Sequence, residues 1–282
     1  PLIDITNCLF KGKECQVYKY KHETKTYSNL VYKQLQGFTV TKDKLVYISS
    51  NNENREKSVM YSYYTKDYNS SYKVTYDTIG HGNGMTYNSK TNKVLVVGPD
   101  EYKKVYQLDG TTLTKEKEFS TSTYPKFNGI GYDYNNDLYI GYTGKRLFMA
   151  DTSKMVTKIE WDMILFETAQ DLEYYNGYLF FITSELGAPN KYQSYSFYTK
   201  GDNFINVYDV KLDSNGNPTK NFGRLICRLY MKGKGELEDI AFSNGSVYLG
   251  FATQKIDKTY SYTFYKISYE EFISKIKIIG SK

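Results

Sequence analysis

The sequence has few histidines and cysteines, which are common metal ligands and catalytic residues. Its 282 residues include two histidines, three cysteines, five prolines and a single tryptophan, Trp161. It has no GxSxG, HExxH or CxxC motif, and the GHGNG segment precedes a predicted strand, so it is not the turn that opens a nucleotide-binding helix. The sequence therefore predicts neither a cofactor nor a metal ion.

Long apolar runs and concentrated charge are also missing. No stretch stays apolar over the roughly 18 residues that indicate a membrane-spanning helix. The 37 basic and 31 acidic residues give a net charge of +6, and no block of like charges occurs. We expect no membrane span and no nucleic-acid partner, because the latter would need a concentrated basic stripe with aromatic residues. The small positive excess favours anionic partners.

The first residues of the chain and the cysteines are relevant to the cellular compartment. The chain begins PLIDIT, without an initiator Met or an apolar signal region, which indicates a processed or excised fragment. Cys8 and Cys15 are close enough to pair in a secreted protein. Cys227 lies in the apolar run RLICRLYM, which predicts a buried thiol.

A repeated unit organises the chain. Residues 80–98 read GHGNGMTYNSKTNKVLVVG, which predicts a strand, a polar turn and a second, buried strand. Four more units follow the same pattern, and they recur at intervals of 42 to 68 residues. The positions on which the units align are Gly37, Gly84, Gly129, Asp171 and Asp239. Units of this length with several strands each are typical of propeller blades.

The repeats predict an all-β fold, a five-bladed β-propeller that forms one domain over residues 1–282. The predicted blades lie near residues 36–78, 79–120, 124–163, 169–230 and 235–270. Alternating strands before residue 36 are expected to complete the last blade and so close the ring. Phe272, Ile276 and Ile279 have helical spacing, which predicts a short C-terminal helix.

A polar residue stands immediately before each aligned position. These residues are Gln36, Asn83, Asn128, Gln170 and Glu238, and we call them the polar ring. Because the first strand of each blade lines the central channel, we expect these side chains to meet at one channel mouth and to bind a ligand. The alternative is that they satisfy backbone groups and trapped waters in a narrow channel.

Acidic residues near the same position raise the possibility of catalysis. Asp171, Glu173, Glu238 and Asp239 belong to sequential blades, so a carboxylate pair for glycoside cleavage is conceivable. A retaining pair needs carboxyl groups about 5 Å apart, and an inverting pair about 6.5–9.5 Å. Buried carboxylates are as often structural, so we keep the glycosidase as the alternative function.

Three further features suggest where a ligand binds. His81 lies between Gly80 and Gly82 beside the polar ring, where its imidazole either contacts a ligand or bonds to a neighbouring blade. Blade four contains an insertion that is either a binding loop or a lengthened hairpin, with candidate contacts Tyr192, Tyr195 and Tyr198. The sequence has 32 tyrosines, and tyrosine is common both on sheet faces and on sugar-binding surfaces.

The QGF segment at Gln36 and the GHGNGMTYNSKTNK segment resemble the propeller of helveticin J-type bacteriocins and of receptor-binding tail proteins of phages that infect Gram-positive bacteria. The resemblance implies an extracellular protein, secreted or on a virion, that is tethered to a larger particle or chain. It also implies a non-catalytic module that recognises a cell-surface polysaccharide or an anionic cell-wall polymer such as teichoic acid.

Overall fold

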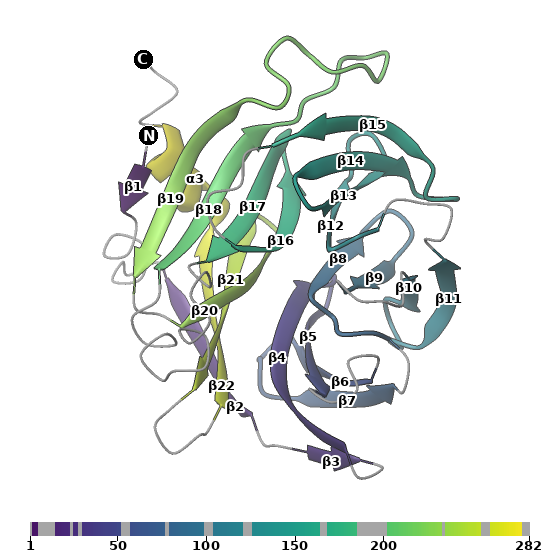
Figure 1. Ribbon diagram of the computed structural model, residues 1–282. Coiled ribbons are helices and arrows are strands. Elements are labelled where there is room, and N and C mark those ends of the chain that lie inside the picture. Colours follow the sequence, from purple (N-terminus) through teal and green to yellow (C-terminus); the bar gives the residue numbers. More distant parts are fainter. Residues whose placement is uncertain are drawn as a thin grey trace.

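The computed structural model is a five-bladed β-propeller with one short C-terminal helix, as the repeats predict (Figure 1). The structure describes residues 2–4, 15–22, 25–27, 30–51, 57–76, 79–98, 104–120, 126–163, 168–184, 202–232, 235–254 and 260–277. Within these ranges, no helix has the length and apolar character that crossing a membrane requires.

The first three blades are consecutive antiparallel sheets. Blade one contains β3 (Lys25–Tyr27), β4 (Leu30–Val40), β5 (Lys44–Asn51), β6 (Ser58–Tyr64) and β7 (Ser71–Tyr76). Blade two contains β8 (Gly84–Asn88), β9 (Lys93–Val97), β10 (Lys104–Asp109) and β11 (Lys115–Ser120). Blade three contains β12 (Gly129–Asp133), β13 (Leu138–Thr143), β14 (Arg146–Asp151) and β15 (Thr157–Asp162).

The last two blades each take a strand from the N-terminus. Blade four contains β16 (Thr168–Tyr175), β17 (Tyr178–Ser184), β18 (Asp202–Asp209) and β19 (Leu225–Lys232), and β1 (Leu2–Asp4) adds to β19 in parallel. Blade five contains β20 (Glu236–Ser243), β21 (Ser246–Gln254) and β22 (Tyr260–Ser268). Its outer strand is β2 (Gln16–His22), paired antiparallel with β22. This pairing confirms the predicted closure of the ring.

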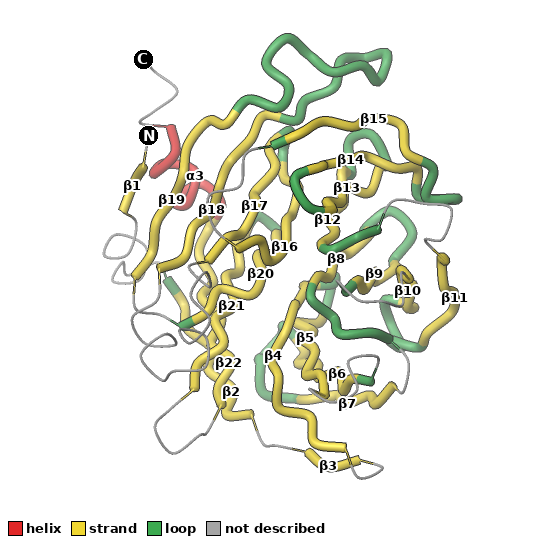
Figure 2. The backbone as a smooth tube through the Cα atoms, viewed as in Figure 1, coloured by secondary structure: helices red, strands yellow, loops and turns green. Residues whose placement is uncertain are grey.

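The backbone trace shows the five sheets radiating from a centre formed by their first strands (Figure 2). These innermost strands are β4, β8, β12, β16 and β20, and each contacts the next around the ring. Helix α3 (Tyr269–Lys277) follows β22 directly and buries Phe272 against blades four and five. In Figure 1, β1 and α3 are drawn on the same side of the molecule.

The core consists of a hydrophobic cluster at each junction between neighbouring blades. Phe38, Tyr47 and Phe264 pack between blades one and five, and Ile48 and Met85 belong to the cluster between blades one and two. Full burial of such side chains contributes about 1.5–3 kcal/mol each. Because every cluster uses two blades, no blade buries its own faces alone, and the ring is the stable unit.

The turns after the first strands of blades one to three are fixed by local sequence. Thr41 Oγ1 accepts from the backbone N–H of Lys44 at 3.0 Å. Asn88 Oδ1 accepts from the N–H of Lys90 at 3.1 Å, and Asp133 Oδ1 from that of Asn135 at 2.9 Å. These residues stand at the same place in three repeats, and side chains of this type hold tight turns by bonding to the backbone two or three residues on.

Candidate functional site

The channel axis is filled by two aspartates from the aligned column. Asp171 and Asp239 are fully buried and hydrogen-bonded to each other. Burial raises the pKa of Asp171 to about 7, and burial together with the charge of Asp171 raises the pKa of Asp239 well above its usual range. Two carboxyl groups in contact cannot both ionise without strong repulsion, so the pair holds a shared proton.

The same two carboxyls tie all five blades together. Asp171 accepts from the backbone N–H groups of Met85 at 3.1 Å and Ile130 at 2.8 Å, and from that of Leu172. Asp239 accepts from the N–H groups of Phe38 at 3.2 Å and Ile240 at 2.8 Å. Each donor follows the aligned position of its own repeat. These five N–H groups would otherwise be buried without a partner, which costs about 1–3 kcal/mol each.

Glycine at two aligned positions makes room for the Asp171 carboxyl. A Cβ atom at Gly84 or at Gly129 would lie 2.7 Å from Asp171 Oδ1. Real Cβ atoms do not approach an oxygen this closely, so any side chain at either position would displace the carboxyl. The three glycines of the aligned column therefore leave room for the carboxyls of its two aspartates to pack at the axis.

The polar ring lies toward the end of the channel where the first strands begin, and hydrogen bonds link its members. Asn83 Nδ2 donates to the backbone oxygens of Asn128 at 2.9 Å and Gln170 at 2.8 Å. Gln170 Nε2 donates to Glu236 Oε1 at 2.9 Å, and Tyr262 Oη donates to the backbone oxygen of Gln36. These contacts join all five blades at the ring.

Glu238 completes the polar ring and is paired with Glu236 on the same strand. The two carboxyls are hydrogen-bonded, and burial raises the pKa of Glu236 to about 7 and that of Glu238 well above its usual range. Asn128 Oδ1 is buried and has no hydrogen-bond partner among the described residues. His81 is buried, with Nδ1 3.0 Å from Ser50 Oγ. A ligand at the polar ring stays a prediction.

The remaining candidates from the sequence are the tyrosines of the blade-four insertion and the cysteines. The insertion tyrosines Tyr192, Tyr195 and Tyr198 lie outside the described residues, as does Cys8. Cys227 is fully buried, as its apolar run predicts, and burial raises its pKa to about 11. Within the described ranges, no three His, Cys, Asp or Glu side chains are placed to hold a metal ion.

A cavity of about 460 Å³ opens where the first strands end, and all five blades contribute to it. Its walls include the residue three positions after each aligned position, and we call this cavity the aromatic funnel. These wall residues are Val40, Tyr87, Tyr132, Tyr174 and Phe242. Tyr134 and Tyr175 also line it, and the Tyr134 side chain is 41% exposed. Ligand pockets commonly have volumes of about 300–1,000 Å³.

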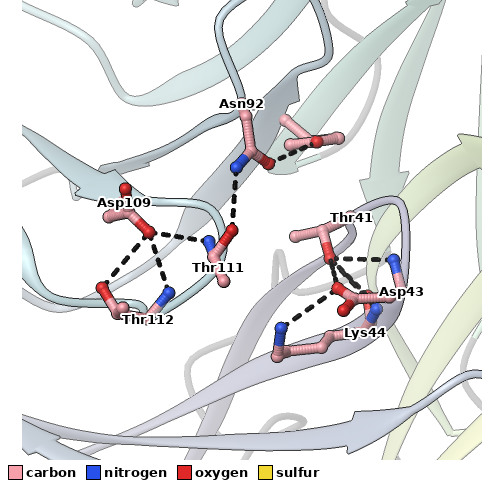
Figure 3. A network of polar contacts seen from close by, with 8 residues as sticks. Thr41, Asp43, Lys44, Asn92, Asp109, Thr111 and Thr112 are labelled. Atoms are coloured by element: carbon pink, nitrogen blue, oxygen red, sulfur yellow. Dashed lines mark hydrogen bonds and ion pairs between the residues drawn. The ribbon is translucent and has the colours of Figure 1, made fainter.

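The funnel tyrosines are held in place through their hydroxyl groups. Tyr87 Oη donates to Asn92 Oδ1 at 2.6 Å, and Asn92 Nδ2 in turn donates to Thr111 Oγ1 at 3.0 Å (Figure 3). Tyr132 Oη donates to Asp137 Oδ1 at 2.8 Å. Asn92 and Asp137 occupy the same turn position in their repeats, with backbone φ angles of 56° and 55°. The repeat therefore supplies both the tyrosine ring and the turn residue that bonds to its hydroxyl.

A second polar cluster in the same view fixes the blade-one turn beside the funnel. Lys44 Nζ donates to Asp43 Oδ1 at 3.0 Å, and Thr41 Oγ1 holds the turn backbone (Figure 3). Lys42, on this turn, lines the funnel with an exposed side chain. Its backbone N–H bonds to the Tyr87 hydroxyl, which joins blades one and two at the rim.

Among the described residues, Glu173 is the one sequence-predicted site residue that lines the funnel. Oε1 accepts from the N–H groups of Tyr132 at 2.9 Å and Tyr174 at 3.0 Å, and Oε2 accepts from Thr86 Oγ1 at 2.7 Å. Burial raises the pKa of Glu173 to about 8. The structure thus separates this carboxyl from Glu238, which belongs to the polar ring.

The aromatic funnel was not predicted from the sequence, although its wall residues share one repeat position. The alignment that identified the polar ring also places one valine, three tyrosines and one phenylalanine three residues after the aligned position. Such a column is equally typical of the packed face of a blade. Period-two alternation indicates only which face of a strand a side chain occupies. It does not tell whether the side chain meets a cavity.

No family model and no curated protein sequence matches the chain. Among solved structures, it is similar to the glutaminyl cyclase of Myxococcus xanthus, with a TM-score of 0.51 and 11% identity over 90% of this chain and 97% of that one. It is also similar to hydrazine synthase of Kuenenia stuttgartiensis, with a TM-score of 0.43 and 12% identity over 84% of this chain and 60% of that one.

A further similar structure is U3-55K, with a TM-score of 0.42 and 8% identity over 84% of this chain and 61% of that one. The chain therefore spans about three fifths of the length of hydrazine synthase and of U3-55K. At these identities the similarity concerns the fold alone. The match to the glutaminyl cyclase, over nearly the full length of both chains, agrees with the propeller.

Proposed function

We propose that the protein is a non-catalytic module that binds a hydroxyl-rich polymer, a bacterial cell-surface glycan or a teichoic-acid-like polymer, and that the aromatic funnel is its binding site. The observation that carries the proposal is the column of aromatic side chains around the 460 Å³ cavity. Aromatic faces offer apolar contact to the C–H face of a sugar ring, and hydrogen bonds from the hydroxyls of Tyr87 and Tyr132 to turn residues hold these rings in place.

Preorganisation supports binding at this mouth. The hydroxyls of Tyr87 and Tyr132 are fixed by turn residues, and the Tyr134 ring packs edge-on against Tyr174 with centroids 5.4 Å apart. A rigid aromatic wall loses little conformational entropy when a ligand binds, so more of the contact energy appears as affinity. The funnel also receives residues from every blade, which suits a polymer that crosses the propeller face.

The arrangement of carboxyl groups favours binding over hydrolysis. A glycosidase places two carboxyl groups on either side of the scissile bond. Asp171 and Asp239 bond to each other, Glu238 bonds to Glu236, and Glu173 is the single carboxyl among the described residues that line the funnel. Two hydrogen-bonded carboxyls leave no space between them for a sugar ring.

The cellular setting belongs to the proposal as well. The resemblance of the QGF and GHGNGMTYNSKTNK segments implies a protein that acts outside the cell, as part of a phage tail or as a bacteriocin-type protein. In either setting the module would be tethered to a larger particle or chain and would direct it to a cell wall.

Titration calorimetry with purified wall teichoic acid and with cell-wall polysaccharide fragments tests the function. Tyr134→Ala removes an exposed funnel ring and should weaken binding about tenfold or more, since losing a single aromatic anchor costs over 1 kcal/mol. Tyr230→Ala is the matched control, because this half-buried ring lies on β19 and does not line the funnel. Equal binding by both variants would place the site elsewhere, and release of reducing sugar by the wild type would identify a glycosidase.

A further inference from the structure

Glu173 is the only side chain among the described funnel residues that can present a carboxyl group to a ligand. Its Oε1 atom is occupied by two backbone N–H groups, whereas Oε2 has one partner, Thr86 Oγ1. A proton on this carboxyl therefore belongs on Oε2. Glu173 directly precedes the wall residue Tyr174 and lines the cavity as a buried side chain.

The surroundings of Glu173 favour its neutral form. Burial is the main cause of the raised pKa of about 8, and the charge of Asp171 on the same strand adds to it. Asp239 on β20 shares a proton with Asp171, and Asp133 on β12 is a further buried acid whose pKa burial raises. The one cationic side chain among the described funnel residues is Lys42.

We infer that the funnel recognises a sugar unit that carries an acidic group, and that the protonated Glu173 carboxyl donates a hydrogen bond to that group. The inference rests on the proposed function, because it specifies the ligand of the same site. With Glu173 neutral, the charge of the described funnel residues comes from Lys42 alone, so an anionic oxygen meets one cation, one carboxyl donor and no anion.

The chemistry of the acceptor separates this ligand class from neutral sugars. A carboxylate or phosphate oxygen can only accept a hydrogen bond, so it needs the proton on Glu173 and is repelled once Glu173 ionises. A sugar hydroxyl can donate instead, so a neutral sugar can bind to either form of Glu173. Binding of an acidic sugar should therefore decrease as the pH rises through about 8, whereas binding of a neutral sugar should change little.

The test measures calorimetric affinity between pH 6.5 and 9.5 for two acidic probes, tetragalacturonate and pentamannose phosphate, and for their neutral counterparts, galactotetraose and mannopentaose. We expect the wild type to prefer at least one acidic probe over its counterpart at pH 6.5 and to lose that affinity about tenfold or more by pH 9.5. The preferred probe shows whether the acidic group is a carboxylate or a phosphate.

Glu173→Gln identifies the titrating group. An amide keeps the acceptor for the two N–H groups and supplies a donor that does not titrate, so this variant should bind the acidic probe equally at both pH values. Glu160→Gln is the control, because Glu160 is half exposed on outer strand β15 and should retain the wild-type pH profile.

Three results would overturn the inference. They are a Glu173→Gln profile that falls as the wild type does, equal affinity for acidic and neutral probes, and an acidic-probe affinity that does not change with pH. The last two use the wild type alone and so do not depend on the folding of a variant. Binding to the neutral probes without preference would leave the proposed function intact, whereas no binding to any carbohydrate or teichoic acid would overturn both.

Discussion

The two ends of the central channel are built from the same five strands but differ in how their polar groups are used. At the polar-ring end, Asn83 and Gln170 bond to groups of neighbouring blades, and Glu238 bonds to Glu236. At the funnel end, tyrosine hydroxyls bond outward to turn residues, so the rings border an open cavity.

This difference shows that polar residues at the centre of a propeller do not by themselves indicate a ligand site. A side chain that already bonds to several blades gains little binding free energy from a ligand, and substituting it lowers the stability of the fold. The rings of Tyr87 and Tyr134 are partly exposed and their hydroxyls are bonded elsewhere, so their faces stay available. We therefore expect changes toward the axis and the polar ring to affect stability, and changes at the funnel to affect binding.

The largest expected effect is on the axial carboxyls. Asp239→Ala removes the acceptor of the Phe38 and Ile240 N–H groups and the partner of Asp171, so the free energy of unfolding should fall by roughly 3 kcal/mol or more. Urea unfolding followed by tryptophan fluorescence measures this change. Asp239→Asn retains an acceptor and a donor to Asp171 and should cost much less. An alanine variant as stable as the wild type would show that the axial pair is dispensable.

The pH dependence of stability is expected to be the next largest effect. The pKa values of Asp171 and Glu236 are raised to about 7 and that of Glu173 to about 8, so the fold favours their neutral forms. The stability they contribute is complete below about pH 4 and is lost as the pH rises toward 8. Each group alone contributes about 1.4 kcal/mol per pH unit between its unfolded and folded pKa, so the free energy of unfolding should be lower at pH 8.5 than at pH 5 by about 2 kcal/mol or more.

Thermal unfolding across this pH range in one buffer series provides the measurement. Asp239→Asn should flatten the profile, because it removes one of the two carboxyls that share a proton. A wild-type profile that rises steadily from pH 5 to 8.5 would contradict the neutral assignment of these buried acids.

A double change of His81 and Asn83 to Ala compares the two mouths directly. Asn83 Nδ2 satisfies two backbone oxygens from blades three and four, so the variant should lose about 1–3 kcal/mol of stability. Its affinity for the polymer should stay within about threefold of the wild type, because the funnel is unchanged. If binding disappears while circular dichroism and melting temperature are unaltered, the ligand site is the polar ring.

The smallest expected effect comes from removing the hydroxyl of a funnel tyrosine while keeping its ring. Tyr87→Phe keeps the aromatic face but loses the 2.6 Å bond to Asn92, which should cost roughly 0.5–1.5 kcal/mol of stability. Affinity should fall only slightly, whereas Tyr87→Ala should weaken binding strongly. Equal affinities for the two variants would show that the ring face makes no contact with the ligand.

Much of the fold could be predicted from the sequence because its signals are local. Strand alternation, turn residues such as Asn88 and Asp133, and the spacing of the repeats each depend on a few neighbouring residues. Closure by β2 and the helix around Phe272 also followed from such patterns. The candidate site could be predicted only in part, since Glu173 was chosen as a carboxylate but without its position in the funnel.

The sequence by itself determined the five repeats, the register of Gly37, Gly84, Gly129, Asp171 and Asp239, and the aromatic column three residues further on. Only the tertiary structure decided which of these residues meet. Asp171 reaches the N–H groups of Met85 and Ile130 across sequence separations of 86 and 41 residues. The same closure buries the acids that become neutral and leaves the tyrosines around an open cavity, because both burial and solvent access depend on all five blades being in place.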